Sequence, residues 1–206
     1  MNRNNTEILV RMEKEYGRDM TCFLDHTEPW QLLIATIMSA QCTDARVNEV
    51  TKVLFKKYPT LEAFAAADLS ELEQDIKSVG FYHNKARNII GCARELLSRF
   101  GGIVPSDIDE LTTLPGVGRK TGNVIRSNIY NEPSVVVDTH VLRISNRLGI
   151  VSTDDPVKAE FDIMKKIDRE YWIYINHWFM TFGRTICSAR SPKCDNCFEC
   201  DLCRSK

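Results

Sequence analysis

Hydrophobic positions recur at helical spacing along almost the whole chain. Between residues 43 and 57, for example, Val47, Val50, Leu54 and Phe55 fall on one face of a helix. The same spacing, with capping residues and chain breakers, predicts further helices. The expected segments are residues 5–16, 30–39, 43–57, 60–67, 70–80, 82–100, 107–111, 119–130, 139–148, 157–170 and 172–184. The pattern therefore predicts an all-α fold.

Local signals mark several of these helix starts and ends. Thr60 is the expected N-cap of one segment, and Ser70 opens the next with Glu73 completing a capping box. Gly80 and the Gly101-Gly102 pair are expected to end two segments. Gly and Pro together total only 17 of 206 residues, which favours long helices over many short strands.

Charge is balanced overall but uneven along the sequence. The net charge is −1, which gives no indication of a nucleic-acid partner. Residues 119–147, however, carry five basic side chains against two acidic, and residues 85–99 carry four against one. These two segments allow a locally basic face on a nearly neutral protein.

Nothing in the sequence predicts export or membrane insertion. The N-terminus MNRNNTEILV has no apolar signal core, and the longest nearly apolar run, 30–38, is about half a membrane span. We therefore expect a cytoplasmic protein. Eight cysteines in that compartment indicate metal ligation or free thiols rather than disulfides.

Five of the eight cysteines crowd into the last twenty residues, in the pattern C-x6-C-x2-C-x2-C-x2-C. They are Cys187, Cys194, Cys197, Cys200 and Cys203. This tail is too polar to build a core, so a cofactor must order it. The spacing favours an iron–sulfur cluster and leaves zinc as the alternative. A 4Fe–4S cluster takes four thiolates, and spacing alone does not identify the spare cysteine.

A glycine turn precedes the segment 119–130, in the sequence LPGVGRKTG at 114–122. Gly116 and Gly118 permit a sharp bend and a close approach to a ligand, and the following helix directs free N–H groups outward. This arrangement suits a phosphate group. The motif matches neither G-x-G-x-x-G nor the Walker loop, and an ordinary tight turn is the alternative.

Two titratable residues stand out near this turn. Lys120 is expected in the first helical turn beside Arg119, where an acid would be more usual, and there it is well placed as an amine nucleophile. Asp138 follows three valines and starts the segment 139–148. Its alternative role is a plain N-cap. Either residue taken alone would be structural.

Several motifs together resemble the endonuclease III family of helix-hairpin-helix DNA glycosylases. They are LPGVGRKT at 114–121, VDTH at 137–140, SAQCTD at 39–44, SVGFYHNKA at 78–86 and the cysteine tail, and the resemblance covers nearly all 206 residues. It implies a 4Fe–4S cluster on Cys187, Cys194, Cys197 and Cys203, which leaves Cys200 spare. Gly122 departs from the family, in which Ala is common at this position.

The resemblance also implies an architecture and a partner. We expect a six-helix domain at 22–132 that carries the hairpin, and a cluster domain made of 1–21 with 133–206. The expected partner is double-stranded DNA that contains damaged bases or abasic sites, bound in a cleft between the two lobes. The protein is expected to be a monomer, associated with the nucleoid and with no membrane.

The implied activity is base-excision repair by a bifunctional glycosylase and AP lyase. Lys120 is the expected nucleophile and Asp138 its electrostatic partner, facing it across the cleft; together they would remove oxidised pyrimidines and cut the strand by β-elimination. The remaining expected sites contact DNA or bind a monovalent cation through backbone carbonyls. They are Gln41, Phe81, Gly116, Gly118, Arg119, His140 and Arg143 for DNA, and Thr112, Leu114 and Val117 for the cation.

Alternatives remain for individual residues and for the activity. Gln41 can be a polar residue at a helix end, Phe81 a core aromatic, and His140 a structural histidine. An adenine or mismatch glycosylase is disfavoured, because Thr36 replaces the glutamate of such relatives and Lys120 is present. A non-catalytic DNA-binding module is the rival from another class, and it would form no covalent adduct with DNA.

Overall fold

The structure is a computed structural model that describes residues 1–19 and 22–204, and these residues form helices and connecting loops with no strand. The all-α prediction is thereby confirmed. The helices are α1 (Arg3–Tyr16), α2 (Pro29–Ser39), α3 (Asp44–Lys57), α4 (Leu61–Ala65), α5 (Leu69–Asp75), η1 (Lys77–Val79), α6 (Tyr82–Phe100), α7 (Ile108–Thr112), α8 (Arg119–Ile129), α9 (Thr139–Arg147), α10 (Pro156–Lys166), η2 (Arg169–Tyr171), α11 (Trp172–Thr185) and η3 (Cys194–Asn196).

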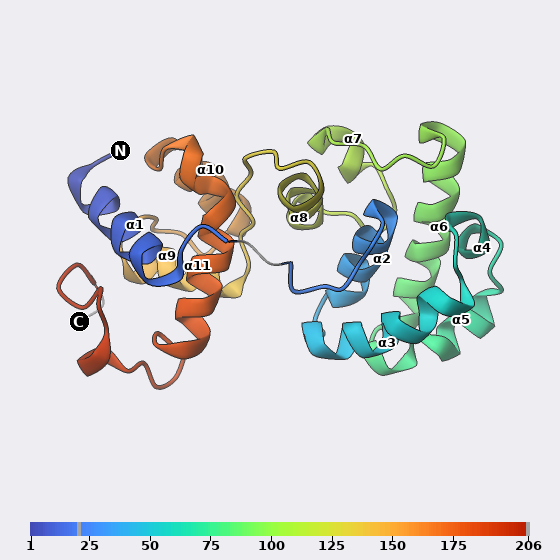
Figure 1. The fold of residues 1–206 in the computed structure, drawn as a ribbon, viewed down its shortest axis with the longest axis horizontal. Helices are drawn as coiled ribbons and strands as arrows, with labels where there is room; N and C mark the ends of the chain where they lie inside the picture. The colour runs from blue at the N-terminus through green and yellow to red at the C-terminus, as the bar shows by residue number, and fades with distance from the viewer. Residues whose placement is uncertain (20–21, 205–206) are drawn as a thin grey trace. The chain divides into compact units, whose positions relative to one another are not determined.

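The chain divides into two compact units (Figure 1). Each unit has its own hydrophobic core. The first unit joins Met1–Thr21 to Asn131–Lys206, and the second unit is Cys22–Tyr130. These boundaries lie within two residues of those expected from the resemblance. None of the helices in the described parts of the chain is both long enough and apolar enough to cross a membrane.

The second unit packs its core around α2 and α6. Seven consecutive residues of α2, from Leu32 to Met38, are buried, which explains the nearly apolar run in the sequence. Residues Ile89, Cys92, Ala93 and Leu96 of α6 add to the same core, and α8 contributes Ile125. The unit therefore anchors α8 in this core, while Lys120 in the first turn of α8 stays exposed.

The first unit is built on α9 and α11, which lie against each other and share a core with α1 (Figure 1). Trp178, Phe179 and Phe182 of α11 are fully buried. Val141 and Ile144 of α9 and Ile8 of α1 pack in the same cluster. The N-terminal helix thus belongs to the core formed by the last third of the chain.

Three local predictions fail. The helix expected at 70–80 ends at Asp75, and the separate 3-10 helix η1 comes before Gly80. The helix at 69–75 is capped by Asp68, whose side chain accepts from Glu71 N at 2.9 Å, so the predicted capping box of Ser70 and Glu73 is wrong. The segment 157–170 is also shorter than expected, because α10 ends at Lys166. Ile167 takes an extended backbone and is buried, and its carbonyl accepts from the Trp172 indole at 2.9 Å.

Gly122 lies at a crowded point between α8 and α7. A Cβ at this position would lie 2.5 Å from Cδ1 of Ile108. In the Ile108→Val background, which lacks that methyl group, we expect Gly122→Ala to stabilise the fold by about 0.5–1 kcal/mol through helix propensity. With Ile108 present, the gain should be smaller because its side chain must move. Urea unfolding of the unmodified protein, Gly122→Ala, Ile108→Val and the double variant measures the gain in each background. Equal gains in the two backgrounds would contradict the close contact between Gly122 and Ile108.

Candidate functional site

The turn at residues 115–118 fixes where α8 begins. Gly116 has φ +77°, and a Cβ there would lie 2.8 Å from Cβ of Asn88 on α6. Glycine is therefore required at position 116 by both the backbone conformation and the available space. Gly118 differs, because its φ is −91° and a Cβ would meet nothing within 4 Å. Its open side leaves room for another molecule to approach the backbone.

Lys120 is exposed in the first turn of α8, directly after this turn. The hydrogen bond from Gly122 N to Gly118 O, at 2.9 Å, closes the first turn of the helix. N–H groups ahead of that bond have no acceptor within the helix, and the helix dipole adds positive potential at this end. A primary amine therefore stands beside N–H donors that suit an anion such as phosphate.

The three carbonyl groups expected to bind a monovalent cation flank the same turn. Thr112 ends α7, and the side chains of Leu114 and Val117 are buried in the core of the second unit. The Leu114 carbonyl accepts from Val117 N at 3.1 Å. A carbonyl oxygen has a second lone pair that a cation can use. A cation site at these carbonyls stays a prediction.

Gln41 and Phe81 share an unusual backbone. Both have positive φ, +56° and +49°, in the left-handed region that residues other than glycine seldom occupy. Both side chains are exposed, Phe81 to 65%. The alternative of Phe81 as a core aromatic is therefore wrong. Strained backbone of this kind gathers at sites of function, and both residues belong to the second unit.

Lys85 is a supporting residue that the sequence reasoning missed. It is 5% exposed, and its Nζ donates to the Val79 carbonyl at 2.9 Å. Burial lowers the pKa of Lys85. This bond ties α6 to the segment just before Gly80 and Phe81, so it fixes the strained turn. The only available signal was its place inside the SVGFYHNKA motif.

Asp138 caps α9 through one of its two carboxylate oxygens. Oδ1 accepts from Val141 N at 2.7 Å, as the N-cap interpretation expects. Among the described residues, Oδ2 accepts no hydrogen bond, and the side chain is half-buried. The cap thus fixes the carboxylate in place while its other oxygen stays open to a substrate or an amine.

His140 and Arg143 interact with each other and with α11. Arg143 Nη2 donates to the carbonyls of Gly183 at 3.1 Å and Cys187 at 3.2 Å, and it lies 3.1 Å from His140 Nδ1. Because a guanidinium only donates, Nδ1 is the acceptor in this pair. Burial lowers the pKa of His140 and favours the neutral ring. These Arg143 contacts are intramolecular, and a contact of either residue with DNA stays a prediction.

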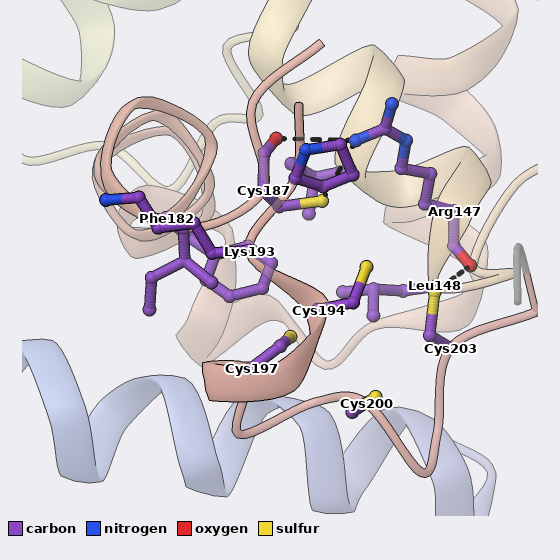
Figure 2. Close-up of a pocket in the computed structure, with 12 residues that line it drawn as sticks. Arg147, Leu148, Phe182, Cys187, Lys193, Cys194, Cys197, Cys200 and Cys203 are labelled. Atoms are coloured by element: carbon purple, nitrogen blue, oxygen red, sulfur yellow. Dashed lines mark hydrogen bonds between the residues drawn. The ribbon is translucent and has the colours of Figure 1, made fainter. Parts of the chain in front are cut away.

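All five clustered cysteines line one cavity in the first unit. The cavity is also lined by apolar side chains, among them Ile144 of α9, Leu148 directly after α9 and Phe182 of α11. Figure 2 shows Leu148 and Phe182 beside the cysteines. Cys194 lies on η3, and Cys200 and Cys203 follow on the loop beyond it. Residues spread over seventeen positions of a polar tail thus converge on a common space.

Two arginines fasten this tail to the helices. Arg147 of α9 donates to Cys187 Sγ at 3.1 Å (Figure 2). It also donates to Ser188 O at 2.8 Å and to Ala189 O at 3.0 Å. Arg11 of α1 donates to Phe198 O at 2.8 Å and pairs with Asp201 at 2.6 Å. The tail is therefore held from two sides by hydrogen bonds rather than by a core of its own.

The residues around the cavity suit an iron–sulfur cluster. Thiols are the ligands that such clusters take, the surroundings are apolar, and Arg147 supplies a hydrogen bond to a ligand sulfur, which tunes such centres. Within 1–19 and 22–204, no group of three or more His, Cys, Asp or Glu side chains is arranged to hold a metal ion. The ligands of a cluster differ from such a group, because they bind separate iron atoms.

Comparison with known proteins places this architecture in one class. Residues 34–169 match the family model for HhH-GPD superfamily base excision DNA repair proteins. That range contains the turn before α8, Lys120 and Asp138, together with Gln41 and Phe81. The chain therefore has the helix-hairpin-helix glycosylase fold.

Individual relatives narrow the class further. Endonuclease III of Synechocystis sp. is 47% identical over 201 residues, covering 97% of this chain and 91% of that protein. Endonuclease III of Bacillus subtilis is 49% identical over 184 residues, covering 89% of this chain and 84% of that protein. A trapped endonuclease III–DNA covalent intermediate matches with a TM-score of 0.92 and 47% identity, covering 99% of this chain and 97% of that chain. The chain belongs to the endonuclease III family.

The two glycines of the turn should respond differently to alanine. Gly116→Ala places a side chain on left-handed backbone, which costs about 1–2 kcal/mol of folding stability. It also overpacks the contact with Asn88, which typically costs ~1–3 kcal/mol more. In Gly118→Ala the new methyl group meets open space, so the only loss is a poorer N-cap residue. That loss costs up to about 1 kcal/mol of folding stability. Urea unfolding curves should show the larger loss of stability for Gly116→Ala. Equal losses would mean that Asn88 does not restrict the turn.

Proposed function

We propose that this protein is a bifunctional DNA glycosylase and AP lyase that excises oxidised pyrimidines and cuts the strand on the 3′ side. The observation that carries the proposal is the exposed Lys120 at the amino end of α8, behind a turn that suits a phosphate. A related endonuclease III, 47% identical over nearly the whole chain, has been trapped in a covalent intermediate with DNA. An amine nucleophile accounts for such an intermediate.

The reaction begins with extrusion of the damaged nucleotide, because a base within the stack is out of reach of a nucleophile. Gln41 and Phe81 are the residues we assign to the vacated duplex. Their side chains are exposed, and the left-handed backbone at Phe81 is held in part by the buried Lys85, which donates to the Val79 carbonyl. A flat ring suits insertion between bases, where it can stack.

Lys120 then attacks C1′ of the deoxyribose with its unprotonated amine. The N-glycosidic bond breaks and the base leaves with the bonding electron pair. Loss of a proton from nitrogen and opening of the sugar ring give a Schiff base between Nζ and C1′. The iminium draws electrons from C2′, so a C2′ proton is removed, and the C3′–O bond breaks by β-elimination.

Asp138 assists this sequence as an anion. We assign its Oδ2 to receiving a proton from the lysine and to stabilising the positive charge that develops on the sugar. Oδ1 is already engaged by Val141 N at 2.7 Å, which fixes the orientation of the carboxylate. A preorganised charge of this kind costs no reorganisation during the reaction.

Affinity for DNA comes from backbone contacts with phosphates. The N–H groups at the start of α8, with the open side of Gly118 and the charge of Arg119, form the assigned phosphate site. Phosphate contacts position a protein without reading sequence. That property fits an enzyme that must find lesions in any sequence context.

The cluster site is assigned to Cys187, Cys194, Cys197 and Cys203. When bound there, the 4Fe–4S cluster supplies four metal–thiolate bonds that order a tail without a core. Arg147 and Arg143 connect that tail to α9, the helix that Asp138 caps. The chain's own hydrogen bonds thus link the ordered tail to the carboxylate.

Lys120→Gln removes the amine and keeps a polar side chain of similar reach. We expect it to abolish the adduct trapped by borohydride and the strand cleavage, while binding to lesion DNA survives through the turn at Gly116. Gel analysis of the trapped adduct and fluorescence anisotropy measure the two effects. Lys52→Gln, at an exposed lysine on α3, is the matched control and should retain both. An undiminished adduct in Lys120→Gln would remove the nucleophile from the proposal.

Asp138→Asn separates the two roles of this side chain. Asn is as good an N-cap as Asp, so stability should be unchanged. Single-turnover cleavage should fall by ~10²–10³, the usual cost of one lost electrostatic partner. The control is Asp155→Asn, because Asp155 caps α10 in the same manner, accepting from Val157 N at 2.7 Å. Cleavage rates that match between the two variants would reduce Asp138 to a cap.

A further inference from the structure

Cys200 is a fifth thiol in a site that needs four. It lies on the loop between Cys197 and Cys203 and lines the same cavity as the four assigned ligands (Figure 2). Its side chain is half-buried. An extra cysteine elsewhere on the surface would have no bearing on a cluster, whereas one on the wall of the cavity competes for iron.

The backbone repeats itself along this part of the tail. Cys197 N donates to Cys194 O at 3.2 Å, and Cys200 N donates to Cys197 O at 3.2 Å. Cys200 therefore follows Cys197 by the same three-residue turn by which Cys197 follows Cys194. The resulting C-x2-C-x2-C run is the spacing with which bacterial ferredoxins start a cluster site.

Cys203 reaches the cavity by a different route. Its Sγ lies 3.5 Å from the carbonyl of Arg147 at the end of α9, and Arg204 N donates to the same carbonyl at 2.9 Å. Cys200 and Cys203 thus approach one cavity from successive points of one loop. Either can complete a set of four with Cys187, Cys194 and Cys197.

We propose that Cys200 is an alternative fourth ligand of the cluster, so that the protein holds the same cluster with Cys203 or with Cys200. The exchange is neutral in electrons. The bond from iron to the Cys203 sulfur breaks and a bond to the Cys200 sulfur forms, while the Cys200 thiol loses the proton that the released Cys203 thiolate gains. The inference rests on the cluster of the proposed function.

Alanine variants test this ligand exchange through iron content. Alanine is chosen because a serine hydroxyl can itself bind iron. Cys200→Ala and Cys203→Ala should each keep about four iron per chain and the visible absorbance of the cluster. The double variant Cys200→Ala/Cys203→Ala should lose both signals, as should the control Cys194→Ala. Loss of iron from Cys203→Ala as complete as from Cys194→Ala would overturn the proposal, as would retention of iron in the double variant.

Thiol labelling gives a second readout that does not depend on iron yield. In the native holoprotein, iodoacetamide should label Cys200 faster than Cys203, as located by peptide mass spectrometry. In Cys203→Ala, Cys200 should become protected. Continued labelling of Cys200 in an iron-loaded Cys203→Ala protein would exclude it as a ligand.

A conservative pair covers the case in which Cys203→Ala does not fold. Cys203→Val keeps a side chain of similar size with no atom that can bind iron, and it is compared with Cys200→Ala/Cys203→Val. More iron in the single variant supports the exchange, and equal iron overturns it. Failure of the proposed cluster itself looks different, because the unmodified protein would then contain no iron.

Discussion

The arrangement of the cysteine tail on the first unit rests on the hydrogen bonds that Arg147 makes with it. Residues 187–203 contribute little to the hydrophobic core, yet five thiols must meet around one cavity. Arg147 binds three successive residues of the tail, from Cys187 to Ala189, and its own carbonyl receives Cys203 and Arg204 at the other end. One residue of α9 thereby closes the tail into a loop.

The same helix, α9, connects this loop to the carboxylate of Asp138. Asp138 caps α9 at its start, Arg143 reaches the tail from the middle of the helix, and Arg147 reaches it from the end. Val141 and Ile144 are buried and anchor α9 in the core of the unit. Because a well-packed helix is rigid, α9 holds Asp138 in a fixed position relative to the tail. In the second unit, the close packing of Gly116 against Asn88 fixes the start of α8. It thereby fixes the position of Lys120 in the first turn of that helix.

Helix positions and caps that depend only on neighbouring residues were predicted from the sequence. Periodicity placed α6 and α8 within one residue of their bounds, and Thr60 and Asp138 act as the predicted caps. Local rules selected Ser70, because Ser70 with Glu73 matches a capping box, whereas Asp68, an equally good cap two residues earlier, is the cap in the structure. The end of α10 was missed because it depends on burial of Ile167 and on the Trp172 bond, which are tertiary contacts.

Features that depend on contacts between distant segments could not be predicted from the sequence either. The left-handed backbone at Gln41 and Phe81 and the inward-facing guanidinium of Arg143 have no local signature. The role of Lys120 as nucleophile came from a family resemblance rather than from geometry. It is also the claim on which the account depends most. Peptide mass spectrometry of the borohydride-reduced DNA adduct tests it most directly, by locating the modified amine. The account predicts the sugar remnant on Lys120 alone, and a remnant on another lysine or on the N-terminal amine would contradict it.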